Sequence, residues 1–359
     1  MTGAVVSAGA ALIVGCVVAI GSAVALAVGT DVGALVGVDT FPLAEQVHPT
    51  SASSSASTGI KKNRFICASP FGSFPLDCPL RAALYLAGGG KICYTAHMRA
   101  SIAFVKTALE EQKASPNRAL GQNFCVDGQR LKTCVEQMTL EQTVIEIGPG
   151  LGGLTELLLE KGVSVTAVEK DAAMADYLSK TLPHPNLAVI TGDALKFRYR
   201  DVPAPFSVVG NLPYYITTPL CTAILKALPA SFYCMVQKEA ADRFFAAPKD
   251  DPYGPLSILV QLFYDAKTLE AFPPDCFYPS PEVQSVFVGM TKKEDAPKVD
   301  PTAFFAFCTQ LLSMRRKTIK NNLKPYPNAA QALSALGIAP ETRAETLSPK
   351  TFLSLYSLL

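Results

Sequence analysis

Apolar and polar residues fall into alternating blocks from Thr143 onward, and these blocks predict strands separated by helices. The run Thr143–Gly148 is apolar and ends in glycines, and Leu154–Glu160 then carries apolar residues at helical spacing. Further strands are predicted in the apolar runs at residues 164–171, 186–193, 205–211 and 231–239. Repeated strand and helix units predict an α/β fold with a parallel sheet, helices on both faces and ligands at the carboxyl ends of the strands.

The pattern becomes helical after Thr291. Asp300 and Pro301 suit a helix N-cap and first turn, and residues 302–323 run apolar early and basic late, which predicts one long helix. The chain is thus divided into a patterned α/β region at 111–290, a small helical domain at 291–359 and a poorly patterned extension at 1–110.

The extension allows three interpretations. Residues 4–30 carry no charge and are long enough to cross a bilayer as a helix, but no Lys or Arg precedes Lys61. Residues 51–58 are serine-rich, and the acid-poor stretch that follows resembles an organelle transit peptide. The third interpretation is that the start site has been assigned too far upstream, because Met98 lies just before the first patterned segment. We expect a cytoplasmic protein, or a plastid or mitochondrial one if the extension is a transit peptide.

Composition limits the chemistry. The 359 residues are 49% hydrophobic and 17% charged with net charge +2, which supports a large core and gives no overall attraction for nucleic acid. Ten cysteines form no CxxC pair, which is typical of buried thiols in a reducing compartment. With only three histidines, we expect no catalytic histidine base and no metal.

A glycine-rich loop and two carboxylates follow the first three predicted strands. Gly148 and Gly150 belong to GPGLGG, which fits a dinucleotide or an S-adenosylmethionine site, and Glu169 stands where a ribose-binding acid belongs. Glu169 could instead be a solvated charge paired with Lys170. Asp193 can accept a hydrogen bond from an adenine amine, but it suits a helix N-cap equally well.

The fourth predicted strand ends in Asn211–Tyr215, NLPYY, which resembles the [DN]PP[YF] signature of methyltransferases that modify planar amines. The Asn211 oxygen and the Leu212 carbonyl can accept both hydrogens of an exocyclic amine, and Tyr214 can stack on the base. A simple turn after a strand is the alternative. This motif favours S-adenosylmethionine over NAD as the cofactor.

From about Pro116 onward the chain resembles the bacterial and organellar small-subunit ribosomal RNA adenine dimethyltransferases. The resemblance rests on the following segments: ALGQNFCVD (119–127), VIEIGPGLGGLT, VEKD, GDAL, NLPYYITTP, QKE (237–239), FYPSPEVQS (277–285) and RRKTIKNNL (315–323). Cys125 stands where the family usually has leucine. The first hundred or so residues match nothing in the family.

This resemblance implies an S-adenosylmethionine-dependent Rossmann-like domain that dimethylates two adjacent adenosines near the 3′ end of small-subunit rRNA. Asn123 and Cys125 would close over the cofactor, with Gly148 and Gly150 against its methionine part, Glu169 on its ribose and Asp193 on its adenine. Asn211 and Tyr214 would hold the target base, and Phe277 would stack on its other face unless it is an ordinary core aromatic. The expected partner is an immature small subunit, bound by a monomer.

A local basic cluster, hidden by the net charge, follows the predicted site. Eight basic and three acidic residues lie between Thr291 and Lys324. On one helix, Arg316, Lys320 and Lys324 would share a face. We expect Arg315, Arg316, Lys317 and Lys320 to contact RNA phosphates, with a solvated helix face as the alternative.

Two other functions remain open. An NAD-dependent oxidoreductase explains the glycine loop and Glu169 but not NLPYY or FYPSPEVQS. A non-catalytic RNA-binding assembly or transcription factor on the same scaffold keeps the fold but leaves the filled catalytic positions unexplained.

Overall fold

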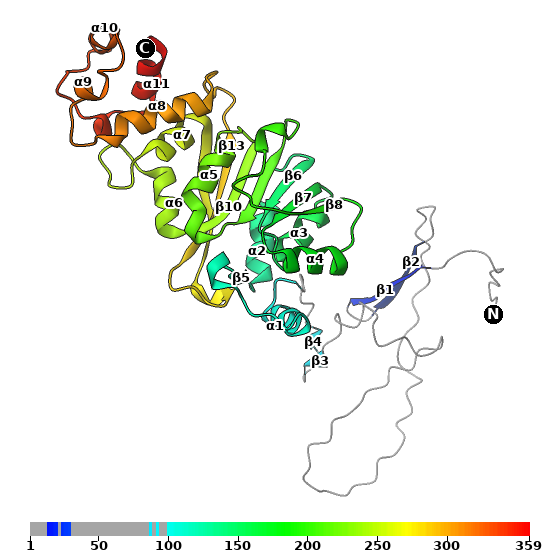
Figure 1. Ribbon diagram of the computed structural model, residues 1–359. Helices are drawn as coiled ribbons and strands as arrows, with labels where there is room; N and C mark the ends of the chain where they lie inside the picture. Colours follow the sequence, from blue (N-terminus) through cyan, green and yellow to red (C-terminus); the bar gives the residue numbers. More distant parts are fainter. Residues whose placement is uncertain (1–12, 21–22, 30–85, 88–90, 93–98) are drawn as a thin grey trace, which may run out of the picture. The chain divides into compact units, whose positions relative to one another are not determined.

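The computed structural model describes residues 13–20, 23–29, 86–87, 91–92 and 99–359 (Figure 1). The chain divides into two units, Met1–Phe74 and Pro75–Leu359. In the first unit, β1 (Ile13–Ile20) and β2 (Ala23–Gly29) form an antiparallel pair. The described part of the apolar segment 4–30 is therefore strand, and the bilayer-crossing helix, one of the three interpretations of the extension, is not seen in these described residues. No described helix is long and apolar enough to cross a membrane. The serine-rich residues 51–58 lie outside the described residues.

A seven-stranded sheet organises the second unit. Its order is β11-β13-β10-β9-β6-β7-β8. The five strands predicted from the sequence are present as β6 (Thr143–Ile147), β7 (Ser164–Glu169), β8 (Leu187–Thr191), β9 (Ser207–Asn211) and β10 (Ser231–Gln237), all parallel. Beyond them, β13 (Ser285–Lys292) pairs antiparallel with both β10 and β11 (Tyr264–Phe272), so the sheet is mixed rather than purely parallel.

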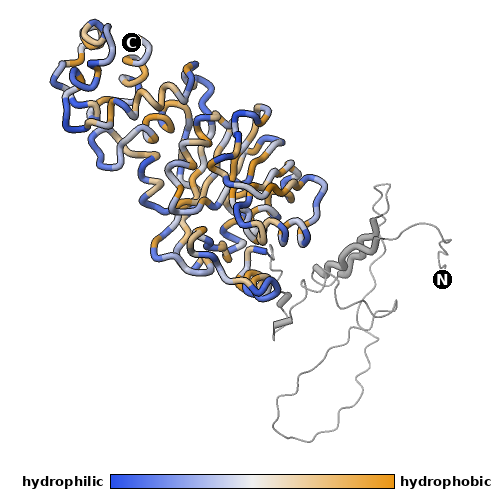
Figure 2. Tube along the Cα trace, in the orientation of Figure 1, coloured by the Kyte–Doolittle hydropathy of each residue, from blue (hydrophilic) through white to orange (hydrophobic). Residues whose placement is uncertain are grey.

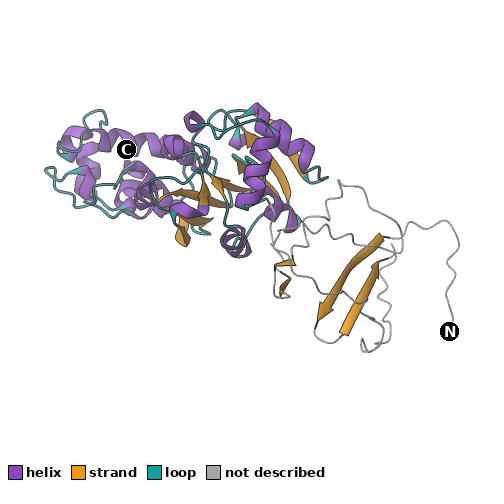
Figure 3. Cartoon of the chain, turned by 90° about the horizontal axis from the view of Figure 1, so that it is seen from below, coloured by secondary structure: helices purple, strands orange, loops and turns teal. Residues whose placement is uncertain are grey.

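Helices cover both faces of this sheet, as Figures 1 and 3 show. Neighbouring strand residues face different cores: Val144 packs with α2 (Gly128–Glu136) and α3 (Gly153–Glu160), whereas Ile145 packs with the other helix layer. That second layer consists of α5 (Thr217–Leu225), α6 (Lys238–Phe245) and α7 (Pro255–Phe263). Apolar positions concentrate along the strands in Figure 2, because both faces of the sheet are buried.

The C-terminal helices extend the same core. They are α8 (Pro301–Ser313), α9 (Ile319–Asn322), α10 (Ala329–Ala335) and α11 (Pro349–Leu358). Asp300 caps α8 by accepting from the amides of Thr302 and Ala303, as its position before Pro301 predicts. Phe304 of α8 belongs to the same buried cluster as Leu259 of α7, so the helical part and the sheet part share one core.

One helix over residues 302–323 is not formed, so that prediction is wrong. Helix α8 ends at Ser313, a turn occupies Met314–Lys317, and α9 starts after Thr318. Thr318 forms a β-bridge with Arg343, and the Ile319 amide donates to the Thr342 carbonyl at 2.6 Å. These long-range backbone contacts replace the local helical ones. Arg316, Lys320 and Lys324 are all exposed, but they do not lie along one helix.

Before the sheet, the second unit contains the short pair β3 (Leu86–Ala87) and β4 (Lys91–Ile92), followed by α1 (Ile102–Glu111). Helix α4 (Ala172–Thr181) packs on β7 and β8. Val105 and Leu109 of α1 join Met174 of α4 and Leu151 in a small buried cluster. Helix α1, which the sequence prediction places in the extension, is thus packed against the α/β domain.

Candidate functional site

A cavity lies at the carboxyl ends of the parallel strands, where the sequence predicts a ligand. Its walls come from the loops after β6, β7, β8 and β9 and from the segment before α2. The predicted site residues on these walls are Asn123, Cys125, Gly148, Gly150, Glu169, Asp193, Asn211 and Tyr214. The structure therefore brings together every predicted cofactor residue and two of the three residues predicted to hold the base.

The glycine loop between β6 and α3 depends on a backbone that only glycine adopts easily. Gly148, Gly150 and Gly152 have φ angles of 63°, 54° and 88°. A Cβ atom on Gly150 would lie 3.1 Å from the ring of Phe124. Larger residues would therefore strain the loop and push Phe124 away from it.

Glu169 is a structural partner of this loop. Its side chain sits at the end of β7, with 7% of the residue exposed, and its Oε2 accepts from the Gly150 amide at 3.0 Å. Oε1 accepts from the Asp171 amide at 2.8 Å. Burial is the main influence on this carboxyl and raises its pKa. The alternative pairing with Lys170 does not form, because the Lys170 Nζ lies 3.3 Å from Asp193 Oδ2 instead.

Asp193 caps a turn rather than a helix, and its adenine-binding role stays a prediction. Its Oδ1 accepts from the Leu195 amide at 3.0 Å and so caps a local turn, while the residue also lines the cavity. The pKa of Asp193 is lowered, mainly by the hydrogen bond from the Leu195 amide and further by the Lys170 ammonium.

The end of β9 presents Asn211 and Tyr214 to the same cavity. Asn211 donates from Nδ2 to the Asn123 carbonyl at 3.0 Å, which leaves its Oδ1 available as an acceptor. The Tyr214 hydroxyl lies 2.7 Å from the Ser285 Oγ, which fixes the ring at the cavity wall. The next residue, Tyr215, also lines the cavity and is 52% exposed.

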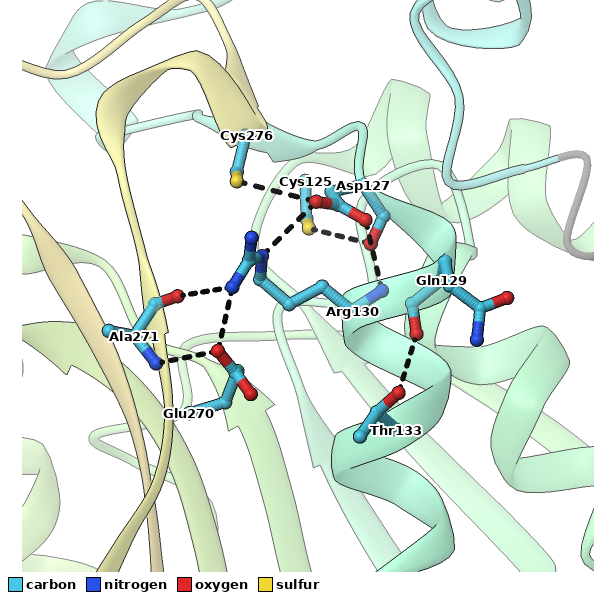
Figure 4. A network of polar contacts seen from close by, with 8 residues as sticks. All are labelled: Cys125, Asp127, Gln129, Arg130, Thr133, Glu270, Ala271 and Cys276. Atoms are coloured by element: carbon cyan, nitrogen blue, oxygen red, sulfur yellow. Dashed lines mark hydrogen bonds and ion pairs between the residues drawn. The ribbon is translucent and has the colours of Figure 1, made fainter.

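Asn123 and Cys125 are held over the cavity by a strand pair and a polar network. Phe124 and Cys125 form β5, which pairs with β12 (Phe277–Tyr278). Figure 4 shows Arg130 beneath this pair: its guanidinium donates to Asp127 Oδ2 at 3.2 Å, to Glu270 Oε1 at 2.7 Å and to the Ala271 carbonyl. Asp127 also caps α2. The network ties the cavity-lining segment to β11.

Phe277 does not reach the cavity. It is 3% exposed and packs in the core, with its ring centroid 6.2 Å from that of Phe272. Its backbone pairs with Cys125, so it supports the wall from behind. The ring therefore lies in an apolar cluster of the core, as the alternative interpretation expects, and not among the residues that line the cavity. Its stacking on a target base stays a prediction.

The predicted RNA-contacting residues lie in the turn after α8 and in α9. Arg316, Lys317 and Lys320 are exposed. Arg315 differs, because its Nε donates to Glu345 Oε2 at 2.8 Å and its Nη1 to the Asp251 carbonyl at 3.1 Å. Arg315 therefore fastens the turn to neighbouring loops, and the other three cations face solvent.

Several residues that line the cavity were not among the predicted site residues, and Gln122, Tyr215 and Arg99 are three of them. Gln122, within the GQNF segment, donates to Asp171 Oδ2 at 2.9 Å, and Tyr215 adjoins the NLPY motif, so both had a signal in the sequence. Arg99 also lines the cavity, through contacts with residues far along the chain that no local pattern reveals. Among the described residues, no group of three or more His, Cys, Asp or Glu could hold a metal.

The sequence of this chain is similar to that of known methyltransferases. The family model described as "Ribosomal RNA adenine dimethylase" matches residues 113–359. Ribosomal RNA small subunit methyltransferase A of Deinococcus radiodurans is 40% identical over 252 residues, covering 68% of this chain and 86% of that protein. The protein of the same name from Neisseria gonorrhoeae is 37% identical over 258 residues, covering 70% and 98%.

Solved structures agree with this comparison. A dimethyladenosine transferase from Plasmodium falciparum has 27% sequence identity and a TM-score of 0.54, covering 63% of this chain and 93% of that one. The 23S rRNA methyltransferase ErmE, at 24% identity and a TM-score of 0.51, covers 66% and 99% and supports the fold. The Rossmann-like methyltransferase fold predicted from the sequence is confirmed.

Proposed function

This chain belongs to the ribosomal RNA adenine dimethylase family, and from that membership we propose that it dimethylates the exocyclic amines of two adjacent adenosines near the 3′ end of small-subunit rRNA, with S-adenosylmethionine as methyl donor. The observation that carries the proposal is the meeting of Glu169, Asp193 and Asn211 at one cavity.

The cavity residues fit this cofactor. Glu169 uses one lone pair on each oxygen for the Gly150 and Asp171 amides, so each oxygen keeps a lone pair for a ribose hydroxyl. Asp193, which lines the same cavity, is the proposed acceptor for an adenine amine. The positive-φ glycines leave the loop backbone bare for close approach. When bound, S-adenosylmethionine supplies an electrophilic methyl group.

The chain's own part in the reaction is to hold the amine. An exocyclic adenine amine is a weak nucleophile because its lone pair is delocalised into the ring. The Asn211 Oδ1 and the Leu212 carbonyl accept the two amine hydrogens, which favours a pyramidal nitrogen aimed at the methyl group. Tyr214, fixed through Ser285, offers its ring to the base. No strong base is required, since the proton is easily lost after transfer.

The matches reported above are to methyltransferases, so an NAD-dependent oxidoreductase and a non-catalytic assembly or transcription factor gain no support from them. We further propose an immature small subunit as the substrate, bound by a monomer without a metal. The proposed location is the cytoplasm, or a plastid or mitochondrion if residues 1–98 act as a transit peptide.

Labelled methyl transfer tests the proposal. Purified protein is incubated with methyl-labelled S-adenosylmethionine and immature small subunits, naked rRNA or DNA, and the product nucleoside is identified. We expect N6,N6-dimethyladenosine from the small subunits. Binding of NADH without binding of S-adenosylmethionine would contradict the proposal, and so would cofactor binding without transfer to any RNA.

A further inference from the structure

A segment outside the family match forms part of the cofactor cavity. The family model starts at residue 113, yet Arg99 and Val105 are among the residues that line the cavity. Arg99 precedes α1, and Val105 lies within it. The cavity described above is therefore incomplete without residues 99–111.

Arg99 joins the glycine loop to the end of a distant helix. Its Nη1 donates to the Leu151 carbonyl at 2.9 Å, and its Nη2 donates to the Thr181 carbonyl at the last residue of α4. The residue is only 6% exposed. A Cβ on Gly152 would lie 3.5 Å from the Arg99 side chain, so the guanidinium lies directly against the loop.

Helix α1 covers the outside of this contact. Ser101 caps the helix by accepting from the Phe104 amide, and Val105 and Leu109 pack against Leu151 of the loop. Phe124, which contacts Gly150, packs against the same cluster. Both the glycine loop and the segment that carries Asn123 thus rest on α1.

We propose that residues 99–111 are a closing element of the cofactor site, and that Arg99 is a positioning residue that fixes the glycine loop for S-adenosylmethionine. This inference rests on the proposed function. Arg99 acts through the Leu151 carbonyl: with that carbonyl held, the Gly150 amide stays directed at Glu169 and the glycine loop keeps its positive-φ backbone. A guanidinium suits the task because its planar fork reaches two carbonyls at once.

Coupling of this kind is reciprocal. If docking of α1 and Arg99 strengthens cofactor binding, cofactor binding must strengthen their docking by the same factor. The two directions can be measured separately, one in variants and one in the unmodified protein.

The first experiment compares full-length Arg99→Met and Arg99→Lys with Lys180→Met. Lys180 is an exposed cation next to Thr181 in the sequence, and its side chain pairs with Asp176. Lys180→Met therefore removes a nearby positive charge and serves as the matched control. We expect Arg99→Met to raise the S-adenosylmethionine Kd, measured by calorimetry, about tenfold, within the usual range of coupling between sites. KM for the cofactor should rise while kcat at saturating cofactor stays near wild type. Arg99→Lys should fall between, and Lys180→Met should match wild type.

An Arg99→Met protein that loses thermal stability but keeps the wild-type Kd and KM would overturn the inference, because a merely structural residue would behave in that way. Failure of the wild-type protein to bind S-adenosylmethionine would instead contradict the proposed function, so the two failures are distinguishable.

Hydrogen exchange on the wild-type chain provides the second test, which stands even if Arg99→Met does not fold. Saturating S-adenosylmethionine should slow amide exchange both in residues 148–153 and in α1. Slower exchange in the glycine loop with unchanged exchange across residues 102–111 would overturn the inference.

Discussion

Glu169 has two tasks at the residue scale, since its carboxylate orders the glycine loop and is proposed to accept from the cofactor ribose. We predict that Glu169→Ala weakens S-adenosylmethionine binding by about 1.5 to 3 kcal/mol, the usual cost of losing a hydrogen bond to a charged group. Glu169→Gln keeps one acceptor oxygen and should lose less. Calorimetry measures both, and an alanine variant with wild-type affinity would remove Glu169 from the site.

Glu146 is a buried acid on β6 that the proposed reaction does not use. It is 1% exposed, and neither carboxyl oxygen has a hydrogen-bond partner in the described part of the chain. Burial raises its pKa from 4.5 to about 8. Between pH 4.5 and about 8 the folded state therefore retains a proton that the unfolded chain has lost. The free energy of unfolding should decrease as the pH rises through this range.

Glu146→Gln should remove that pH dependence, because glutamine does not titrate. The measurement is the free energy of unfolding by denaturant at pH values across the window. Glu136→Gln, at an exposed position of α2, is the control and should keep the wild-type slope. A Glu146→Gln protein with the same slope as wild type would show that another group causes it.

The site residues could be predicted from the sequence where a motif fixes both residue and strand end. Glu169 and Asn211 end β7 and β9, and Asp193 follows β8, so their meeting follows from the parallel arrangement of β6 to β9. Phe277 and Arg99 could not be placed in this way. Whether Phe277 faces the cavity depends on its pairing with Cys125, and the role of Arg99 depends on Leu151 and Thr181, both more than fifty residues away.

At the scale of elements, the turn Met314–Lys317 and helix α9 carry the exposed cations Arg316, Lys317 and Lys320. We predict that the double variant Arg316→Gln, Lys320→Gln binds RNA with a shallower salt dependence. The slope of log K against log salt concentration should decrease by roughly 0.7 to 0.9 per lost phosphate contact. Methyl transfer at saturating substrate should remain nearly normal. The binding constant for immature small subunits is measured over a range of salt concentrations.

Lys161→Gln with Lys180→Gln, two exposed lysines of the α/β domain, is the charge-matched control. If the Arg316 and Lys320 double variant binds with unchanged affinity and salt slope, these cations form an ordinary solvated surface and the RNA docks elsewhere.

The break between α8 and α9 shows why this element was mispredicted. Helical spacing continues through residues 302–323, so the local signal favours one helix. The bridge between Thr318 and Arg343, which are 25 residues apart, and the contact of Arg315 with Glu345, which are 30 apart, outweigh that local preference. The antiparallel direction of β13 was missed for the same reason, because it depends on pairing with β10 and β11 and not on the local sequence pattern.

For the whole molecule, activity and cofactor binding can test where the N-terminal extension ends and the functional α/β domain begins. We predict that a chain starting at Met98 folds and methylates as well as the full chain, because it retains Arg99 and α1. A chain starting at Lys113, where the family match begins, should bind S-adenosylmethionine more weakly. Activity and cofactor affinity of both are compared with the full chain. Aggregation of the Met98 protein beside a soluble full-length protein would assign a structural role to residues 1–97.

The central claim is that one cavity binds the cofactor and presents the amine, with Asn211 as the acceptor for the amine hydrogens. The most direct measurement is the rate of methyl transfer by Asn211→Ala at saturating S-adenosylmethionine, together with its cofactor Kd. Transfer should fall by roughly a hundredfold or more, as when one group that stabilises a transition state is removed. The Kd should rise by no more than about tenfold, the cost of the single hydrogen bond to Asn123. Turnover close to wild type would contradict the claim.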